Sequence, residues 1–286
     1  MTPRTIKTAL AATAVLGFAF AGMANAEAAD DTLVIDGTEI VTRAPASAHL
    51  DGALPELYSG WHFRDADTRA MEADDFDNPG MIYVDRGLDS WNTVDGTEGK
   101  SCASCHEGPE SMKGLRAVTP RVDAKTGKLM NIEAYINDCR TTRMGAEAWG
   151  DKAEAMTDVM ALISVQSRGE IMNVATDGAA APFYEKGKEM YYTRYGQLEL
   201  SCANCHEQNY GNYIRSDHLS QGQTNGFPVY RLKDTKLTTA QGRFVGCVRD
   251  TRAETFKIGS DEFNALELYV ASRGNGLAVE GVSVRN

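Results

Sequence analysis

The chain has 286 residues, of which 29 are Lys or Arg and 40 are Asp or Glu, and its net charge at pH 7 is −11. This acidic balance argues against nucleic acid or an anionic membrane surface as a partner. Hydrophobic residues make up 42% of the sequence, which is ordinary for a globular protein. The length is enough for about two domains.

Residues 1–26 have the pattern of a secretory signal peptide. The basic residues Arg4 and Lys7 precede an apolar run over residues 9–21, and Ala24-Asn25-Ala26 forms an A-x-A cleavage site. The apolar run is too short to span a bilayer, and no later segment is long and apolar enough to do so. We therefore expect cleavage after Ala26 and a periplasmic protein with no membrane anchor.

Residues 27–80 match nothing in the rest of the chain, and we interpret them as an N-terminal extension. Within it, the apolar triplet at residues 33–35 and the mixed one at 39–41 flank Asp36-Gly37. Asp-Gly between two such runs is a strong signal for a short β-hairpin.

Two C-x-x-C-H runs follow, at residues 102–106 and 202–206. This spacing is the signature of covalently attached c-type haem. The two thiols bond to the haem vinyl groups, and the adjacent His binds the iron from one side. The sequence therefore predicts two haem c groups and redox chemistry. The attachment residues are Cys102, Cys105, Cys202 and Cys205, and the proximal iron ligands are His106 and His206.

The two runs belong to an internal repeat. Gly87 and Gly187 differ by 100 positions, as do the first cysteines of the two runs, and a Ser-Arg-Gly triplet closes each half at 167–169 and 272–274. Each half is predicted to contain a helix, a haem-binding loop, a long irregular segment and a closing helix. We therefore predict a mainly α fold with two tandem class I cytochrome c-like domains related by internal duplication, at residues 81–176 and 177–286.

The remaining cysteines, Cys139 and Cys247, occupy equivalent places in the repeat. One interpretation is a disulfide, which is common between leftover cysteines in an oxidising compartment. The other makes each thiolate the distal ligand of its own haem. Because no Met follows His206, the second haem lacks the usual downstream Met ligand, and its candidates are Cys247 and His218. His218 is only 12 residues past His206, which is close for reaching the opposite face of the haem, so the thiolate interpretation is favoured there. The first half contains Met112, Met130 and Met144, so Met ligation stays open at that haem.

Arg243 stands four residues before Cys247, whereas Tyr135 stands four residues before Cys139. In a helix, residues four apart share a face. A guanidinium beside a reactive sulfur is suited to holding an oxyanion, although pairing with a haem propionate is the alternative. A thiolate at Cys247 would also leave a sulfur nucleophile beside a redox centre.

These motifs resemble the SoxA family, the dihaem subunits of the SoxAX cytochromes of bacterial sulfur oxidation. The resemblance covers nearly the whole mature chain and includes residues 59–61 and 75–80, both C-x-x-C-H runs, Cys139 and the segment 243–247. It implies an L-cysteine S-thiosulfotransferase, which oxidatively joins thiosulfate to a cysteine thiol of the carrier protein SoxYZ and releases two electrons. It also implies that Cys247 is the active-site sulfur and haem ligand, often a persulfide, and that Arg243 binds the anionic substrate.

The resemblance further implies a heterodimer with a SoxX-like monohaem cytochrome, which passes electrons to a small cytochrome c. The competing hypothesis is a periplasmic dihaem cytochrome that only carries electrons. That hypothesis predicts distal Met or His ligands and no loss of function without Arg243. A dihaem peroxidase is a third class, and it needs one haem with an open or releasable distal site.

Overall fold

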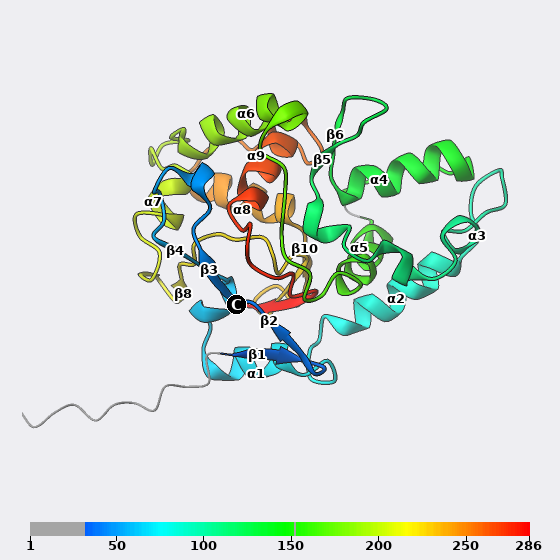
Figure 1. Cartoon of the computed structure of the whole chain (residues 1–286), viewed down its shortest axis with the longest axis horizontal. Helices are drawn as coiled ribbons and strands as arrows, with labels where there is room; N and C mark the ends of the chain where they lie inside the picture. The colour runs from blue at the N-terminus through cyan, green and yellow to red at the C-terminus, as the bar shows by residue number, and fades with distance from the viewer. Residues whose placement is uncertain (1–31, 152) are drawn as a thin grey trace, which may run out of the picture. The chain divides into compact units, whose positions relative to one another are not determined.

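The computed structural model describes residues 32–286 apart from residue 152, and the predicted signal peptide lies outside these described residues (Figure 1). The fold is mainly α with short strands. The helices are α1 Ala66–Ala73, α2 Met81–Asn92, α3 Ala103–His106, α4 Ile132–Cys139, α5 Glu154–Val165, α6 Ala181–Tyr192, α7 Cys202–His206, α8 Ala240–Asp250 and α9 Asp261–Ser272. The strands are β1 Leu33–Ile35, β2 Thr38–Ile40, β3 Arg43–Pro45, β4 Glu56–Tyr58, β5 Arg121–Val122, β6 Leu129–Met130, β7 Tyr213–Ile214, β8 Asp217–His218, β9 Val229–Arg231, β10 Lys236–Thr238 and β11 Ser283–Arg285.

Two helix pairs organise the fold, because α2 packs against α5 and α6 packs against α9 (Figure 1). Each pair crosses at a glycine. A Cβ atom at Gly87 would overlap the backbone carbonyl oxygen of Asp158 in α5, and one at Gly187 would overlap that of Ala265 in α9. The two repeated glycines therefore permit a backbone approach that no larger residue allows.

The closing helices α5 and α9 are buried along most of their length. At the start of α9, the hydroxyl of Ser260 accepts a hydrogen bond from the backbone N–H of Phe263, and Asp261 and Glu262 occupy the first turn. A capping hydroxyl and acidic residues at a helix N-terminus satisfy free N–H groups and oppose the helix dipole. Polar residues thus fix the start of a helix whose body is core.

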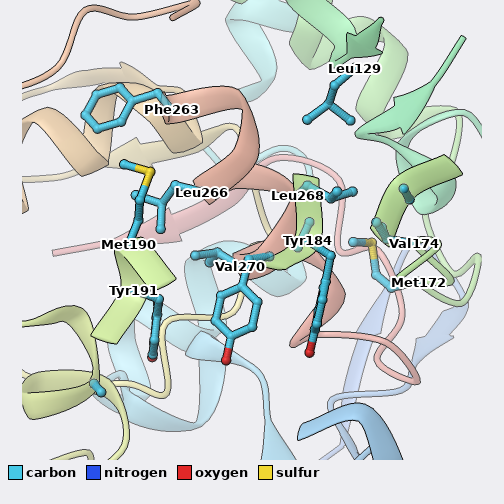
Figure 2. Close-up of a cluster of buried hydrophobic side chains, with 14 of the residues drawn as sticks. Leu129, Met172, Val174, Tyr184, Met190, Tyr191, Phe263, Leu266, Leu268 and Val270 are labelled. Carbon is cyan, nitrogen blue, oxygen red and sulfur yellow. The ribbon is translucent and has the colours of Figure 1, made fainter. Parts of the chain in front are cut away.

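The largest apolar core joins the two halves of the chain. It is built around α6 and α9, and Tyr184 and Tyr191 of α6 and Leu268 of α9 are buried in it (Figure 2). Leu129 and Met172, from the first half, pack into the same cluster. Residues Thr32–Asn286 accordingly form one compact unit.

The segment before the first helix pair packs against the C-terminal part of the chain. β1 and β2 pair antiparallel through a turn in which Asp36 and Gly37 both have positive φ, of 47° and 73°. Buried Trp61 lies in one cluster with this strand pair and Ala278. β11 lies parallel to β9, which holds the chain end in a three-stranded sheet with β10.

A buried charge cluster reinforces this junction. Arg285 in β11 donates a hydrogen bond to the carboxyl group of Glu72 in α1 and forms an ion pair with Glu280, whose second oxygen accepts a hydrogen bond from Ser59. The carboxyl groups of Glu72 and Glu280 are fully buried. Within the part of the chain that the structure describes, no helix has both the length and the apolar character needed to cross a membrane.

Candidate functional site

The first C-x-x-C-H run borders a cavity of about 550 Å³. Cys105 and His106 lie on α3, and Cys102 immediately precedes that helix. Cys139, the last residue of α4, lines the same cavity. The volume falls within the range of about 300–1,000 Å³ that is typical of cofactor pockets. The structure therefore brings the four predicted residues of the first site together around a space suited to a cofactor.

The thiols in this cavity are close enough to affect one another. Burial raises the pKa of the Cys102 thiol, and the neighbouring Cys139 thiol raises it further. Burial also raises the pKa of Cys139, with a smaller contribution in the same direction from Cys105. The ring of Trp91 lies 5.8 Å from that of His106, and its Nε1 donates a hydrogen bond to the carbonyl oxygen of Glu107 at 3.0 Å. Trp91 thus packs near His106 and holds the backbone that follows the first C-x-x-C-H run.

Basic side chains also line the first cavity, and several are held by neighbours. Arg121 Nε donates to the hydroxyl oxygen of Tyr135 at 3.0 Å. Arg140 donates to the Asp95 carboxylate at 2.7 Å. These groups provide positive charge for acidic substituents of a cofactor. Met112 and Met144 line the cavity as well, so the structure leaves them beside Cys139 as distal-ligand candidates.

At the second run, the proximal histidine is fixed by a backbone group. Nδ1 of His206 lies 2.8 Å from the carbonyl oxygen of Ser220. A carbonyl only accepts, so Nδ1 carries the proton and Nε2 presents its lone pair to a metal. Burial lowers the pKa of His206 to about 4, which keeps the ring neutral as ligation requires. Gly222 leaves room for the ring, since a Cβ there would lie 2.9 Å from His206 Cγ.

Helix α8 places the predicted catalytic pair, Arg243 and Cys247, beside the thiols of the second C-x-x-C-H run. Its N-terminus is capped by Thr239, whose hydroxyl accepts from the N–H of Gly242 at 3.1 Å. Arg243 and Cys247 are four residues apart in this helix and share a face. The Cys247 sulfur is the largest cause of the raised pKa of Arg243, which shows that guanidinium and sulfur are neighbours. Burial and then Cys247 raise the pKa of Cys205.

All six cysteines, which lie within the described residues, are free of disulfide bonds. Cys139 lines the first cavity, and Cys247 interacts with the thiols of the second run. The two leftover cysteines therefore serve different sites, and the disulfide alternative has no geometric support. The donor set at each site, two thiols, an imidazole and a further sulfur, fits a covalently bound haem.

This fold and these two sites define a c-type cytochrome. The family described as SoxA/TsdA, cytochrome c domain, matches residues 86–172 and 186–279. The two matched segments confirm two cytochrome c domains, whose cofactor is covalently bound haem c.

Comparison with individual proteins narrows the class of c-type cytochrome to which the chain belongs. The L-cysteine S-thiosulfotransferase subunit SoxA of Paracoccus pantotrophus is 65% identical over 290 residues, covering 99% of this chain and all of the relative. The subunit of the same name from Rhodovulum sulfidophilum is 56% identical and covers 97% of each chain. The crystal structure of SoxXA from P. pantotrophus matches with a TM-score of 0.88 and 66% identity, covering 90% of this chain and 99% of that one. The chain belongs to the SoxA family of L-cysteine S-thiosulfotransferase subunits, which confirms the family predicted from the motifs.

Some residues that shape the sites are absent from the sequence-based prediction. Ser220 acts through its carbonyl group, which every residue has, so no side-chain signal could identify it. Trp91 could in principle be predicted from the repeat, because it follows Gly87 by four residues as Tyr191 follows Gly187. The repeat thus contained a signal for the aromatic residue beside the first haem loop.

Proposed function

We propose that this chain catalyses the oxidative joining of thiosulfate to a cysteine thiol of a SoxYZ carrier protein. The carrier thiol and the terminal sulfur of thiosulfate form one S–S bond. The thiol loses one proton, and two electrons leave with bond formation. The single observation that carries the proposal is the placement of Arg243 and Cys247 together beside the second C-x-x-C-H run.

Two haem c groups complete the proposed enzyme. Cys102 and Cys105 would attach the first, and His106 and Cys139 would bind its iron. The second is held by Cys202, Cys205, His206 and Cys247. When bound, the haems accept the released electrons one at a time. The similar helix pairs α2–α5 and α6–α9 support an origin by duplication, with domains at residues 81–176 and 177–286.

The residues of α8 account for substrate binding at the second site. Arg243 is partly buried and the neighbouring Cys247 raises its pKa, so its guanidinium stays charged and can hold the sulfonate oxygens of thiosulfate by charge-assisted hydrogen bonds. Cys247, one helical turn away, presents sulfur to the terminal sulfur of the bound anion. In the proposed sequence, the Cys247 thiolate and the terminal sulfur of thiosulfate form an S–S bond as two electrons leave. The carrier thiol then attacks that terminal sulfur, loses its proton and displaces the Cys247 thiolate, so the whole thiosulfate unit passes to the carrier.

The proposed partners follow from the electron balance and from the family. A single haem accepts one electron, so a second acceptor is needed. A SoxX-like monohaem cytochrome, bound as a heterodimer, supplies it and passes electrons to a small cytochrome c. The SoxXA crystal structure supports this pairing because its SoxA fold matches this chain. We propose a periplasmic location after cleavage behind Ala26, with no nucleic-acid or membrane partner.

A matched pair of variants of the haem-loaded heterodimer tests the proposal. Cys247→Met should abolish thiosulfate-dependent electron release while haem content stays normal. Cys139→Met, the equivalent change in the first half, should retain most of that activity and raise the potential of the first haem. Normal turnover in Cys247→Met would overturn the catalytic role of this sulfur.

The electron-carrier hypothesis is supported by one observation, the presence of Met112 and Met144 in the first cavity. If it is correct, electron transfer between partner cytochromes will be unaffected by Cys247→Met or Arg243→Ala, and no S–S product will form on the carrier. Mass measurement of the carrier protein separates the two functions.

A further inference from the structure

Three charged side chains meet where the two haem-binding halves join. Arg116 begins the short helix η4 (Arg116–Val118), Glu133 lies in α4 and Glu267 lies in α9. They line one cavity of about 10 Å³, about the space of one water molecule. Among the described residues that line this cavity, no other is charged. Two acidic groups therefore share one cation.

The Glu267 carboxylate connects the two helices that carry Cys139 and Cys247. Its Oε2 accepts one hydrogen bond from Asn131 Nδ2 and another from Gln241 Nε2, each at 2.8 Å. Asn131 is the N-cap of α4, and Gln241 lies in the first turn of α8. The two helices that carry the proposed distal ligands Cys139 and Cys247 thus both begin against the Glu267 carboxylate.

Arg116 extends the cluster to the proximal side of the second site. Its Nε donates to the carbonyl oxygen of Phe227 at 3.1 Å, and its Nη2 donates to that of Thr224. These residues follow Ser220, whose carbonyl holds His206. Because the guanidinium directs these hydrogen bonds to backbone carbonyls, it offsets the charge of the two acids without forming a close pair with either.

The geometry favours one proton on the pair. Oε2 of Glu133 is buried and accepts no hydrogen bond from any described residue. An ionised oxygen in such a place is costly, whereas a protonated carboxyl group is not. Burial and the neighbouring Glu267 raise the pKa of Glu133 to about 8, and burial also raises the pKa of Glu267. Arg116 opposes both shifts but does not cancel them.

This proton lies close to the first haem cavity. Ile132 lines both the small cavity and the 550 Å³ cavity, so one side chain separates the two spaces. Glu133 follows Ile132 and is six residues before Cys139 in the same helix. In a medium of low polarity, a charge change across such a separation is weakly screened.

We propose that Glu133 and Glu267 form a redox-linked proton site: where both carboxylates are ionised while the haem of the first site is oxidised, the pair takes up one proton from solvent when that haem gains an electron. The inference rests on the first haem of the proposed function. The electron is one of the two released when the S–S bond forms, and the proton converts one carboxylate to a carboxylic acid. The net charge of the buried region is then unchanged. The first haem would therefore store an electron at a potential that depends on pH.

The direct test is a spectroelectrochemical titration of the haem-loaded protein between about pH 6 and about pH 9. Cys139→Met identifies the potential of the first haem, because it shifts that potential selectively. One proton coupled to one electron lowers the potential by up to ~59 mV per pH unit. We expect this dependence in the parent protein around pH 8, the pKa of Glu133. A carboxylic acid C=O band should accompany it in the redox difference infrared spectrum.

Three variants and a control separate a proton site from a structural role. Glu133→Gln and Glu267→Gln should each flatten the pH dependence and remove the C=O band, and Glu133→Asp should restore both. Glu154→Gln, at the exposed end of α5, removes the same charge and should leave the dependence intact. A parent potential independent of pH, or an unchanged dependence in both Gln variants, overturns the proposal. Thiosulfate turnover measured on the same samples reports separately on the proposed function.

Discussion

The carbonyl oxygen of Ser220 lies 2.8 Å from Nδ1 of His206, and this contact sets the orientation of the proximal imidazole in the second site. It places the proton on Nδ1 and leaves the lone pair of Nε2 free to bind a metal. Helix α8 carries Cys247 and Arg243, and Cys247 lies close enough to the same run to raise the pKa of Cys205. A backbone group that holds the imidazole and one helix therefore shape the second site.

Gly222→Ala tests the proximal contact. Gly222 has φ of +76°, and an added Cβ would lie 2.9 Å from His206 Cγ, so we expect the imidazole to be displaced. The absorption and EPR signals of the second haem should change, and those of the first should not. Gly127→Ala is the matched control, because Gly127 has φ of +69° but open space around it. Identical haem signals in both variants would show that the close approach of Gly222 is unimportant.

Arg243→Ala tests anion binding. Removing a buried charged partner typically costs about 2–5 kcal/mol, which corresponds to roughly 30-fold to several-thousand-fold in kcat/KM. Arg243→Lys should fall between Ala and the parent, since Lys keeps the charge without the two-pronged geometry. The haem spectra should change little in either variant. An unchanged rate with thiosulfate would favour the alternative role of Arg243, which is pairing with a haem propionate.

The repeated glycines give a stability prediction. Gly87→Ala and Gly187→Ala should each lower the free energy of unfolding by about 1–3 kcal/mol, because the added methyl group overlaps a backbone carbonyl of the facing helix. Gly150→Ala, where a Cβ meets nothing within 4 Å, should be nearly neutral. Thermal unfolding of the three variants and the parent protein measures these differences in stability. Equal stability of all three would mean that the helix crossings tolerate a wider separation.

These results show which parts of the structure the sequence could predict. Covalent haem attachment requires a fixed spacing of Cys and His, so both sites could be located from the sequence. The repeat placed Gly87 and Gly187 at equivalent positions, and the structure places each at a helix crossing. The family comparison then confirms the predicted activity class.

Other features could not be predicted, because they depend on contacts between distant residues. Asn131 and Glu267 lie 136 positions apart, and only the folded chain shows that one caps α4 while bonding to the other. Arg116 resembles any surface arginine in the sequence, yet its side chain is buried against backbone carbonyls. The shared core between the halves is likewise invisible to a repeat-based division into two domains.

The buried carboxyl group of Glu72 should make the stability of the protein depend on pH. Burial raises its pKa from 4.5 to about 8 in the folded protein. Between these values the folded state binds more protons than the unfolded chain, so the free energy of unfolding should fall as pH rises. Glu72→Gln removes this titration and should weaken the decline between about pH 5 and about pH 8. Denaturant titrations across this range measure it, and an identical pH profile in both proteins would contradict the assignment.

The proposed function depends most on whether the sulfurs of Cys139 and Cys247 bind the haem irons. Low-temperature EPR of the oxidised, haem-loaded protein tests this most directly. We predict two low-spin ferric signals with the narrow g-spread of thiolate–imidazole ligation, and loss of one signal in each of Cys139→Met and Cys247→Met. Signals with the wide g-spread of bis-His or His/Met ligation at both haems, unchanged in the variants, would contradict the account and return the protein to the class of electron carriers.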